Sequence, residues 1–82
     1  MGARRIRVQY YAVLREQAGK GHEELTTAAA TPADLYSELQ SRYPFHLGRG
    51  QLKVAVNTEF SEWSRPLNEG DVVVFIPPMA GG

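Results

Sequence analysis

Apolar and polar residues alternate near the start of the chain with the period of a half-buried strand. Ile6, Val8 and Tyr10 fall on one side of this segment, and Arg7 and Gln9 fall on the other. We therefore expect a strand over residues 6–10 with Ile6, Val8 and Tyr10 facing the core. A second, weaker strand is expected over residues 22–26.

A short helix is predicted after the first strand. Leu14 and Ala18 are four residues apart, and Gly19 suits the left-handed conformation that ends a helix. The spacing predicts a helix over residues 12–18.

The main helix is predicted to begin at Thr31, whose hydroxyl can cap the first free N–H groups, with Pro32 at the first helical position. Asp34 suits the positive end of the helix. An apolar stripe of Leu35, Leu39 and Tyr43 extends the predicted helix as far as Pro44.

The second half of the chain is predicted to be mostly strands. Residues 52–56 indicate one strand, followed by a turn at Asn57-Thr58, and Gly70 suits a tight turn over residues 67–71. The apolar run 72–76 indicates a central strand covered on both faces. Because one principal helix covers only one face of a sheet, the fold class is α+β with a mixed sheet. The 82 residues predict one domain over residues 1–76 and an extended tail over residues 77–82.

The predicted last strand, residues 72–76, has apolar side chains on both of its sides. Val73 and Phe75 point to one side, whereas Val72, Val74 and Ile76 point to the other. Only one set can lie under the helix, so the other forms an apolar patch or meets a partner. The alternative is that loops cover the second set.

Composition excludes several classes of protein. Nine basic residues balance nine acidic ones, which argues against a nucleic-acid binder. The absence of cysteine removes disulfides and thiolate chemistry. No apolar run is long enough to span a bilayer and no signal peptide is visible, so we expect a soluble, cytoplasmic protein without membrane contact.

Side chains offer little catalytic chemistry. His22 and His46 lack metal-ligand spacing, so no metal site is predicted. Glu23 and Glu24 are adjacent on a strand and should point to opposite faces, which prevents them from acting as a pair. No serine triad and no phosphate-binding loop is visible. The cluster Arg4, Arg5 and Arg7 is interpreted as a solvated strand edge.

The C-terminal segment is the strongest functional candidate. Two prolines favour an extended exit from the sheet, and six extended residues reach about 20 Å. Terminal glycines let the backbone pass through a narrow channel. The carboxylate of Gly82 is then accessible for activation as an acyl adenylate. The competing interpretation is a terminus whose glycines have no role. The proposed inserting tail consists of Pro77, Pro78, Met79, Ala80, Gly81 and Gly82.

Several segments together carry a family resemblance. The segments 10–16, 55–57 and 67–71, followed by Phe75-Ile76-Pro77-Pro78-Met79-Ala80-Gly81-Gly82, resemble the small subunit of molybdopterin synthase, the MoaD family of ubiquitin-like sulfur carriers. The resemblance covers essentially the whole chain in order, and its final stretch is the most specific.

The resemblance implies a β-grasp fold and a non-catalytic carrier subunit. A ubiquitin-activating-type enzyme would use ATP to adenylate Gly82, and a sulfur donor protein would then supply the sulfur of a thiocarboxylate. The tail would insert into the large synthase subunit, which contributes the catalytic side chains, and deliver sulfur to the pterin precursor of the molybdenum cofactor. This chain would bind no cofactor itself. The family's apolar docking positions fall on Tyr11, Phe60 and Ile76.

Two departures leave alternatives open. Met79 stands where the family usually has a β-branched residue, and the role of Trp63 is not assigned. Trp63 either packs beneath a loop or marks a relative with another acceptor. The same carrier chemistry would serve thiazole synthesis, another sulfur pathway or conjugation to protein lysines. A ubiquitin-like interaction module without tail chemistry is the remaining alternative.

Overall fold

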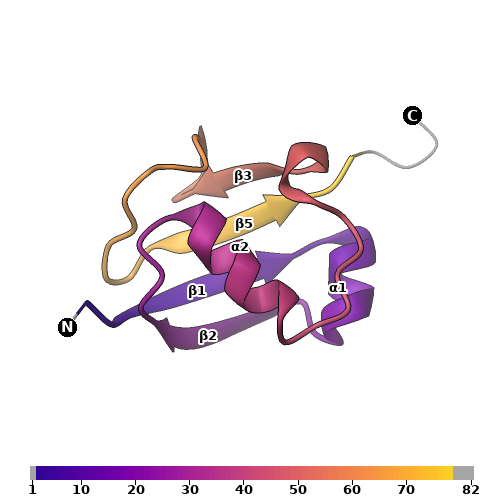
Figure 1. The fold of residues 1–82 in the computed structure, drawn as a ribbon, viewed down its shortest axis with the longest axis horizontal. Helices are drawn as coiled ribbons and strands as arrows, with labels where there is room; N and C mark the ends of the chain where they lie inside the picture. Colours follow the sequence, from indigo (N-terminus) through magenta and orange to yellow (C-terminus); the bar gives the residue numbers. More distant parts are fainter. Residues whose placement is uncertain (1, 79–82) are drawn as a thin grey trace.

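The computed structural model describes residues 2–78, and Met1 and residues 79–82 lie outside the described part. The five strands form one sheet in the order β2-β1-β5-β3-β4, and α2 lies across one face of it (Figure 1). This confirms the α+β class and is the β-grasp arrangement that the resemblance implies. The elements are β1 (Arg4–Tyr10), α1 (Ala12–Ala18), β2 (His22–Thr27), α2 (Pro32–Gln40), the 3-10 helix η1 (Arg49–Gln51), β3 (Lys53–Val56), β4 (Glu59–Ser61) and β5 (Val72–Ile76).

The centre of the sheet is the parallel pair β1 and β5. Val8 pairs with Val73 and Tyr10 with Phe75, whereas β2, β3 and β4 are joined to their neighbours by antiparallel pairing. The predicted central position of the last strand is therefore confirmed. Because β1 and β5 are parallel, the C-terminal ends of both strands lie next to each other, at the same end of the sheet.

Pairing register sorts the strand residues into two faces, because paired residues share a face and neighbours along a strand alternate. The face under α2 contains the fully buried Ile6, Val8, Val54, Val73 and Phe75. We call the other one the open face. Its strand residues are Arg5, Arg7, Gln9, His22, Glu24, Thr26, Lys53, Ala55, Phe60, Val72, Val74 and Ile76.

The expectation that β5 is covered on both faces is wrong. Val73 and Phe75 are 0% exposed, but Val72, Val74 and Ile76 are only half-buried. The reason is that α2 covers one face of the sheet, whereas within residues 2–78 no second layer of similar size covers the other face (Figure 1). These three side chains are partly exposed, so any covering of this face by loops is incomplete.

Gly19 ends α1 and Thr31 caps the start of α2, as predicted, but α2 is shorter than predicted. The backbone N–H of Asp34 donates to the Thr31 hydroxyl at 3.2 Å, as expected for the cap. The helix ends at Gln40, before Tyr43. The hydroxyl of Ser41 donates to the Glu38 carbonyl at 2.6 Å and competes with helical hydrogen bonding. Pro44 also disfavours a helical Tyr43.

Three smaller predictions need correction. The strand predicted from residue 52 begins at Lys53, because the Leu52 N–H donates to the Arg49 carbonyl and ends η1. A short strand, β4, follows the turn at Asn57-Thr58 and was not predicted. Arg5 and Arg7 are exposed, as predicted for the arginine cluster, but β1 is flanked by β2 and β5, so the cluster does not lie at a sheet edge.

Candidate functional site

Tyr11 lies directly beside the end of β5. It follows Tyr10, which pairs with Phe75, so Tyr11 is level with Ile76 on the neighbouring strand. Its backbone is still extended, with φ −127° and ψ 154°, so its side chain leaves on the side opposite to Tyr10. The Tyr11 side chain therefore reaches the open face, and the residue is 51% exposed.

A polar contact of Tyr11 agrees with this placement. The Tyr11 hydroxyl lies 3.5 Å from the side-chain oxygen of Gln9, which belongs to the open face. Gln9 pairs with Val74, two residues before Ile76. The aromatic ring thus borders the apolar residues of β5.

Phe60 extends the same surface to the far edge of the sheet. It pairs with Ala55, and Ala55 pairs with Val74 on β5. Phe60 is 73% exposed, the most exposed of the large apolar side chains in the described part of the chain. Two strand spacings and a two-residue offset separate its Cα from that of Ile76 by roughly 12 Å.

The structure therefore brings the three predicted partner-binding residues onto one face. Tyr11 and Ile76 lie at the end where β1 and β5 finish, and Phe60 lies two strands away from β5. Val74 and Ala55 fill the space between them and belong to the same surface. The period-two alternation of their strands could have placed Val74 and Ala55 on this face. Alternation alone does not show which residues of other strands they lie beside.

The root of the tail is partly packed. Pro77 is buried and Pro78 is exposed. A surface hollow of about 300 Å³ lies beside this root, between η1 and the end of β5. It is lined by Gly50, Gln51, Leu52, Lys53, Ile76, Pro77 and Pro78. The predicted inserting residues Met79, Ala80 and Gly81 and the predicted reactive residue Gly82 lie outside the described residues.

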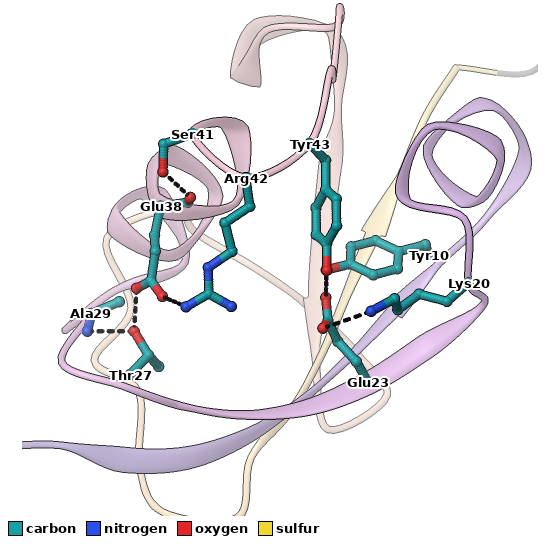
Figure 2. Close-up of polar contacts among 9 residues, drawn as sticks. All are labelled: Tyr10, Lys20, Glu23, Thr27, Ala29, Glu38, Ser41, Arg42 and Tyr43. Atoms are coloured by element: carbon teal, nitrogen blue, oxygen red, sulfur yellow. Dashed lines mark hydrogen bonds and ion pairs between the residues drawn. The ribbon is translucent and has the colours of Figure 1, made fainter.

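A carboxylate that accepts two tyrosine hydroxyl groups lies on the opposite face. Glu23 accepts hydrogen bonds from the Tyr10 hydroxyl at 2.5 Å and the Tyr43 hydroxyl at 2.8 Å, and Lys20 lies 3.5 Å from it (Figure 2). Glu24 points to the open face and pairs with Arg7 at 2.8 Å. The two carboxylates therefore lie on opposite faces, as predicted, and do not form a catalytic pair.

Burial and hydrogen bonding together shift the pKa values in this cluster. Burial raises the pKa of Glu23, but hydrogen bonds from Tyr10 and Tyr43 and the charge of Lys20 outweigh it and hold the pKa below its ordinary value. Burial, together with the hydrogen bond to Glu23, raises the pKa of Tyr10. Glu23 is therefore an ionised structural acceptor that joins β2 to β1 and to the turn after α2.

Neither histidine lies in a cluster that suggests a metal. His22 is exposed at the start of β2, and the His46 ring contacts the Gln17 side chain at 3.3 Å. Within residues 2–78, no three His, Asp or Glu side chains are grouped so that they could hold a metal ion. The described helices also include none that is long and apolar enough to cross a membrane.

A sequence model of the ThiS family matches residues 8–82. The match includes the C-terminal tail through Gly82 and the whole sheet except the first residues of β1. The chain belongs to the ThiS family.

Family members with similar sequences include two curated bacterial proteins named molybdopterin synthase sulfur carrier subunit. The Escherichia coli (strain K12) protein is 32% identical over 80 residues, covering 94% of this chain and 99% of the relative. The Mycobacterium tuberculosis (strain ATCC 25618 / H37Rv) protein is 35% identical over 83 residues, covering 95% and 98%.

A solved Pyrococcus furiosus protein, described as subunit 1 of a molybdopterin converting factor, has the same fold. It is 30% identical and superposes with a TM-score of 0.77, covering 93% of this chain and 99% of that one. Sequence and fold therefore agree along nearly the full length of the chain.

Proposed function

We propose that this chain is the sulfur carrier subunit of a molybdopterin synthase and that the carboxylate of Gly82 is the group that carries sulfur. The observation that carries the proposal is the family match through Gly82 together with curated relatives of that name. The structure supports it with a sheet whose central strand β5 ends one residue before the proline pair. The chain therefore leaves the sheet from its central strand.

The chemistry requires activation because a free carboxylate is a poor acyl group. An adenylating enzyme joins the Gly82 carboxylate to the α-phosphate of ATP and releases pyrophosphate. A sulfur donor protein then supplies sulfur as hydrosulfide, which attacks the acyl carbon, displaces AMP and loses its proton to water. The product is a C-terminal thiocarboxylate, with one oxygen exchanged for sulfur. Because ATP is consumed, we place this step in the cytoplasm.

The partner that receives the tail is the large subunit of the synthase. The name of the curated relatives, a subunit of molybdopterin synthase, supports an assembly of this kind. The open face supplies the docking surface, because Tyr11, Phe60 and Ile76 expose apolar area around the tail root. The catalytic side chains that act on the pterin precursor belong to the large subunit, so this chain is a carrier within the enzyme.

The direct test is mass spectrometry of the intact protein. Incubation with a competent adenylating enzyme, ATP and a sulfur donor should give a species with one oxygen replaced by sulfur. A variant with one residue added after Gly82 should keep its fold and remain unmodified. Recovery of only unmodified wild-type protein, when the same enzyme modifies a known carrier, would contradict the proposal.

The acceptor is tested separately in cells that lack the native carrier. The full chain should restore molybdenum cofactor production, and a variant ending at Gly81 should not. Thiocarboxylation without rescue would indicate another acceptor, such as thiazole synthesis or protein lysines. Rescue by the variant ending at Gly81 would contradict tail chemistry altogether and favour an interaction module.

A further inference from the structure

Lys53 occupies a central place on the surface that surrounds the tail root. It is the first residue of β3 and pairs directly with Ile76, the last residue of β5. Both residues belong to the open face, and Lys53 is exposed. Two residues further along β3, Ala55 pairs with Phe60. Lys53 therefore lies directly beside Ile76 and diagonally across from Phe60 on the open face.

Lys53 also borders two surface hollows. One is the hollow beside Pro77 and Pro78 described above. The other is lined by Leu52, Lys53, Val54, Phe60, Ser61 and Trp63. A partner side chain that enters either hollow therefore lies close to Lys53.

The charges of the open face are unevenly balanced. Its strand residues include the cations Arg5, Arg7 and Lys53 but a single carboxylate, Glu24, which pairs with Arg7 at 2.8 Å. The other ion pairs of the described residues, Lys20–Glu23 and Arg42–Glu38, involve side chains of other surfaces. Lys53 takes part in none of these three pairs.

Docking over this surface removes water from an ammonium group, and an unpaired charge in an apolar interface is costly. We infer that Lys53 is a specificity-determining residue of the docking surface and that the large subunit presents a carboxylate to it. The fitting partner surface is an apolar patch that covers Ile76 and Phe60, with an acidic side chain placed at the hollows beside β3. This inference rests on the proposed function, which supplies the partner. It adds a charge requirement that the three apolar positions do not contain.

The test compares binding of the large subunit to wild type, Lys53→Met and Lys53→Glu, each prepared with a preformed C-terminal thiocarboxylate so that activation is bypassed. Methionine keeps an apolar stem but leaves the partner carboxylate without its cation. We expect titration calorimetry to show affinity reduced about tenfold for Lys53→Met and about a hundredfold for Lys53→Glu. Affinity should fall with added salt for wild type and much less for Lys53→Met.

Ser37→Glu is the matched control. Ser37 is exposed on α2, on the opposite side of the sheet, and the substitution changes net charge by the same amount as Lys53→Met. It should bind like wild type, and thermal unfolding should show that all three variants remain folded. If Lys53→Met binds as tightly as wild type with the same salt dependence, the inference is wrong. If wild type itself does not bind, the proposed function fails first, so the two failures are distinguishable.

Discussion

The indole ring of Trp63 lies flat against the ring of Phe75, with centroids 5.9 Å apart and planes 12° apart. Tyr36 of α2 contacts both rings, at centroid distances of 6.2 Å to Trp63 and 5.1 Å to Phe75. The segment after β4 is therefore packed onto β5 and α2, one residue before the end of the strand that carries the tail. Trp63, whose role the sequence left unassigned, is a packing residue at the edge of the core.

Trp63→Ala should lower the free energy of unfolding by about 2 kcal/mol, because it removes a half-buried ring and its aromatic contacts. Trp63→Phe keeps a ring in the same place and should lose less than half as much. Urea unfolding followed by circular dichroism measures both values. A loss below about 0.5 kcal/mol for the alanine variant would contradict the packing role.

Glu23 predicts a pH dependence of stability. Its pKa is lowered in the folded protein from the ordinary value of 4.5. A lowered folded pKa stabilises the protein fully above the unfolded pKa, and this stabilisation is lost as pH falls through the folded pKa. Stability should therefore decline below about pH 4.5, in part because Glu23 becomes protonated.

Glu23→Gln isolates this contribution. The glutamine keeps an acceptor for the Tyr10 and Tyr43 hydroxyl groups but removes the charge, so we expect a loss of about 1 kcal/mol at pH 7. The difference in unfolding free energy between wild type and variant should shrink as pH is lowered from 5 to 3. Glu62→Gln, at an exposed position, removes the same charge and is the control for the change in net charge. A constant difference for Glu23→Gln would show that its charge does not contribute.

The hairpin between β3 and β4 stores backbone strain that can be removed. Asn57 and Thr58 have φ angles of 53° and 73°, in the left-handed region that a β-branched residue rarely adopts. Thr58→Gly should raise the unfolding free energy by about 1 kcal/mol, because glycine at the second turn position suits this hairpin geometry. Thermal or urea unfolding checks this, and a destabilised glycine variant would show that the Thr58 side chain makes a compensating contact.

The side chain of Asn57, the neighbouring residue in this turn, makes two hydrogen bonds that stabilise the fold. Its amide donates to the Asp71 carboxylate at 2.9 Å, and its oxygen accepts from the Val72 N–H at 2.9 Å. These bonds tie the hairpin to the turn that starts β5. Asn57→Gly should therefore destabilise the protein although it fits the same turn, which makes it an informative companion to Thr58→Gly.

Phe60→Asp tests the open face as a docking surface. Phe60 is 73% exposed, so the substitution should leave the unfolding free energy within about 0.5 kcal/mol of wild type. Binding to the large subunit should weaken at least about tenfold, because a charge without a partner enters an apolar interface. Calorimetric titration measures the affinity, with Ser37→Asp on α2 as the control. Equal affinity of Phe60→Asp and wild type would remove this residue from the docking surface.

Core positions on the first strand and several helix ends could be predicted from the sequence. Alternation placed Ile6 and Val8 in the core, and the cap at Thr31 and the left-handed Gly19 marked helix limits that the structure confirms. These features depend on neighbours a few residues away, so the residues themselves specify them. The family resemblance rests equally on sequence, since it depends on motifs along the chain and on the tail through Gly82.

Pairings between distant segments were decided only by the tertiary structure. The run 72–76 is equally apolar on both sides, and only its place beside β1 and β3 left Val74 and Ile76 on an open face. The apolar spacing predicted that Tyr43 belongs to α2, but Tyr43 lies beyond the end of the helix, where its hydroxyl donates a hydrogen bond to Glu23. The sequence spacing contains no information about this contact. Lys53 acquired its position the same way, through a register with Ile76 that no local pattern encodes. Sequence determines which surfaces are apolar or charged, whereas long-range strand pairing determines which of them meet.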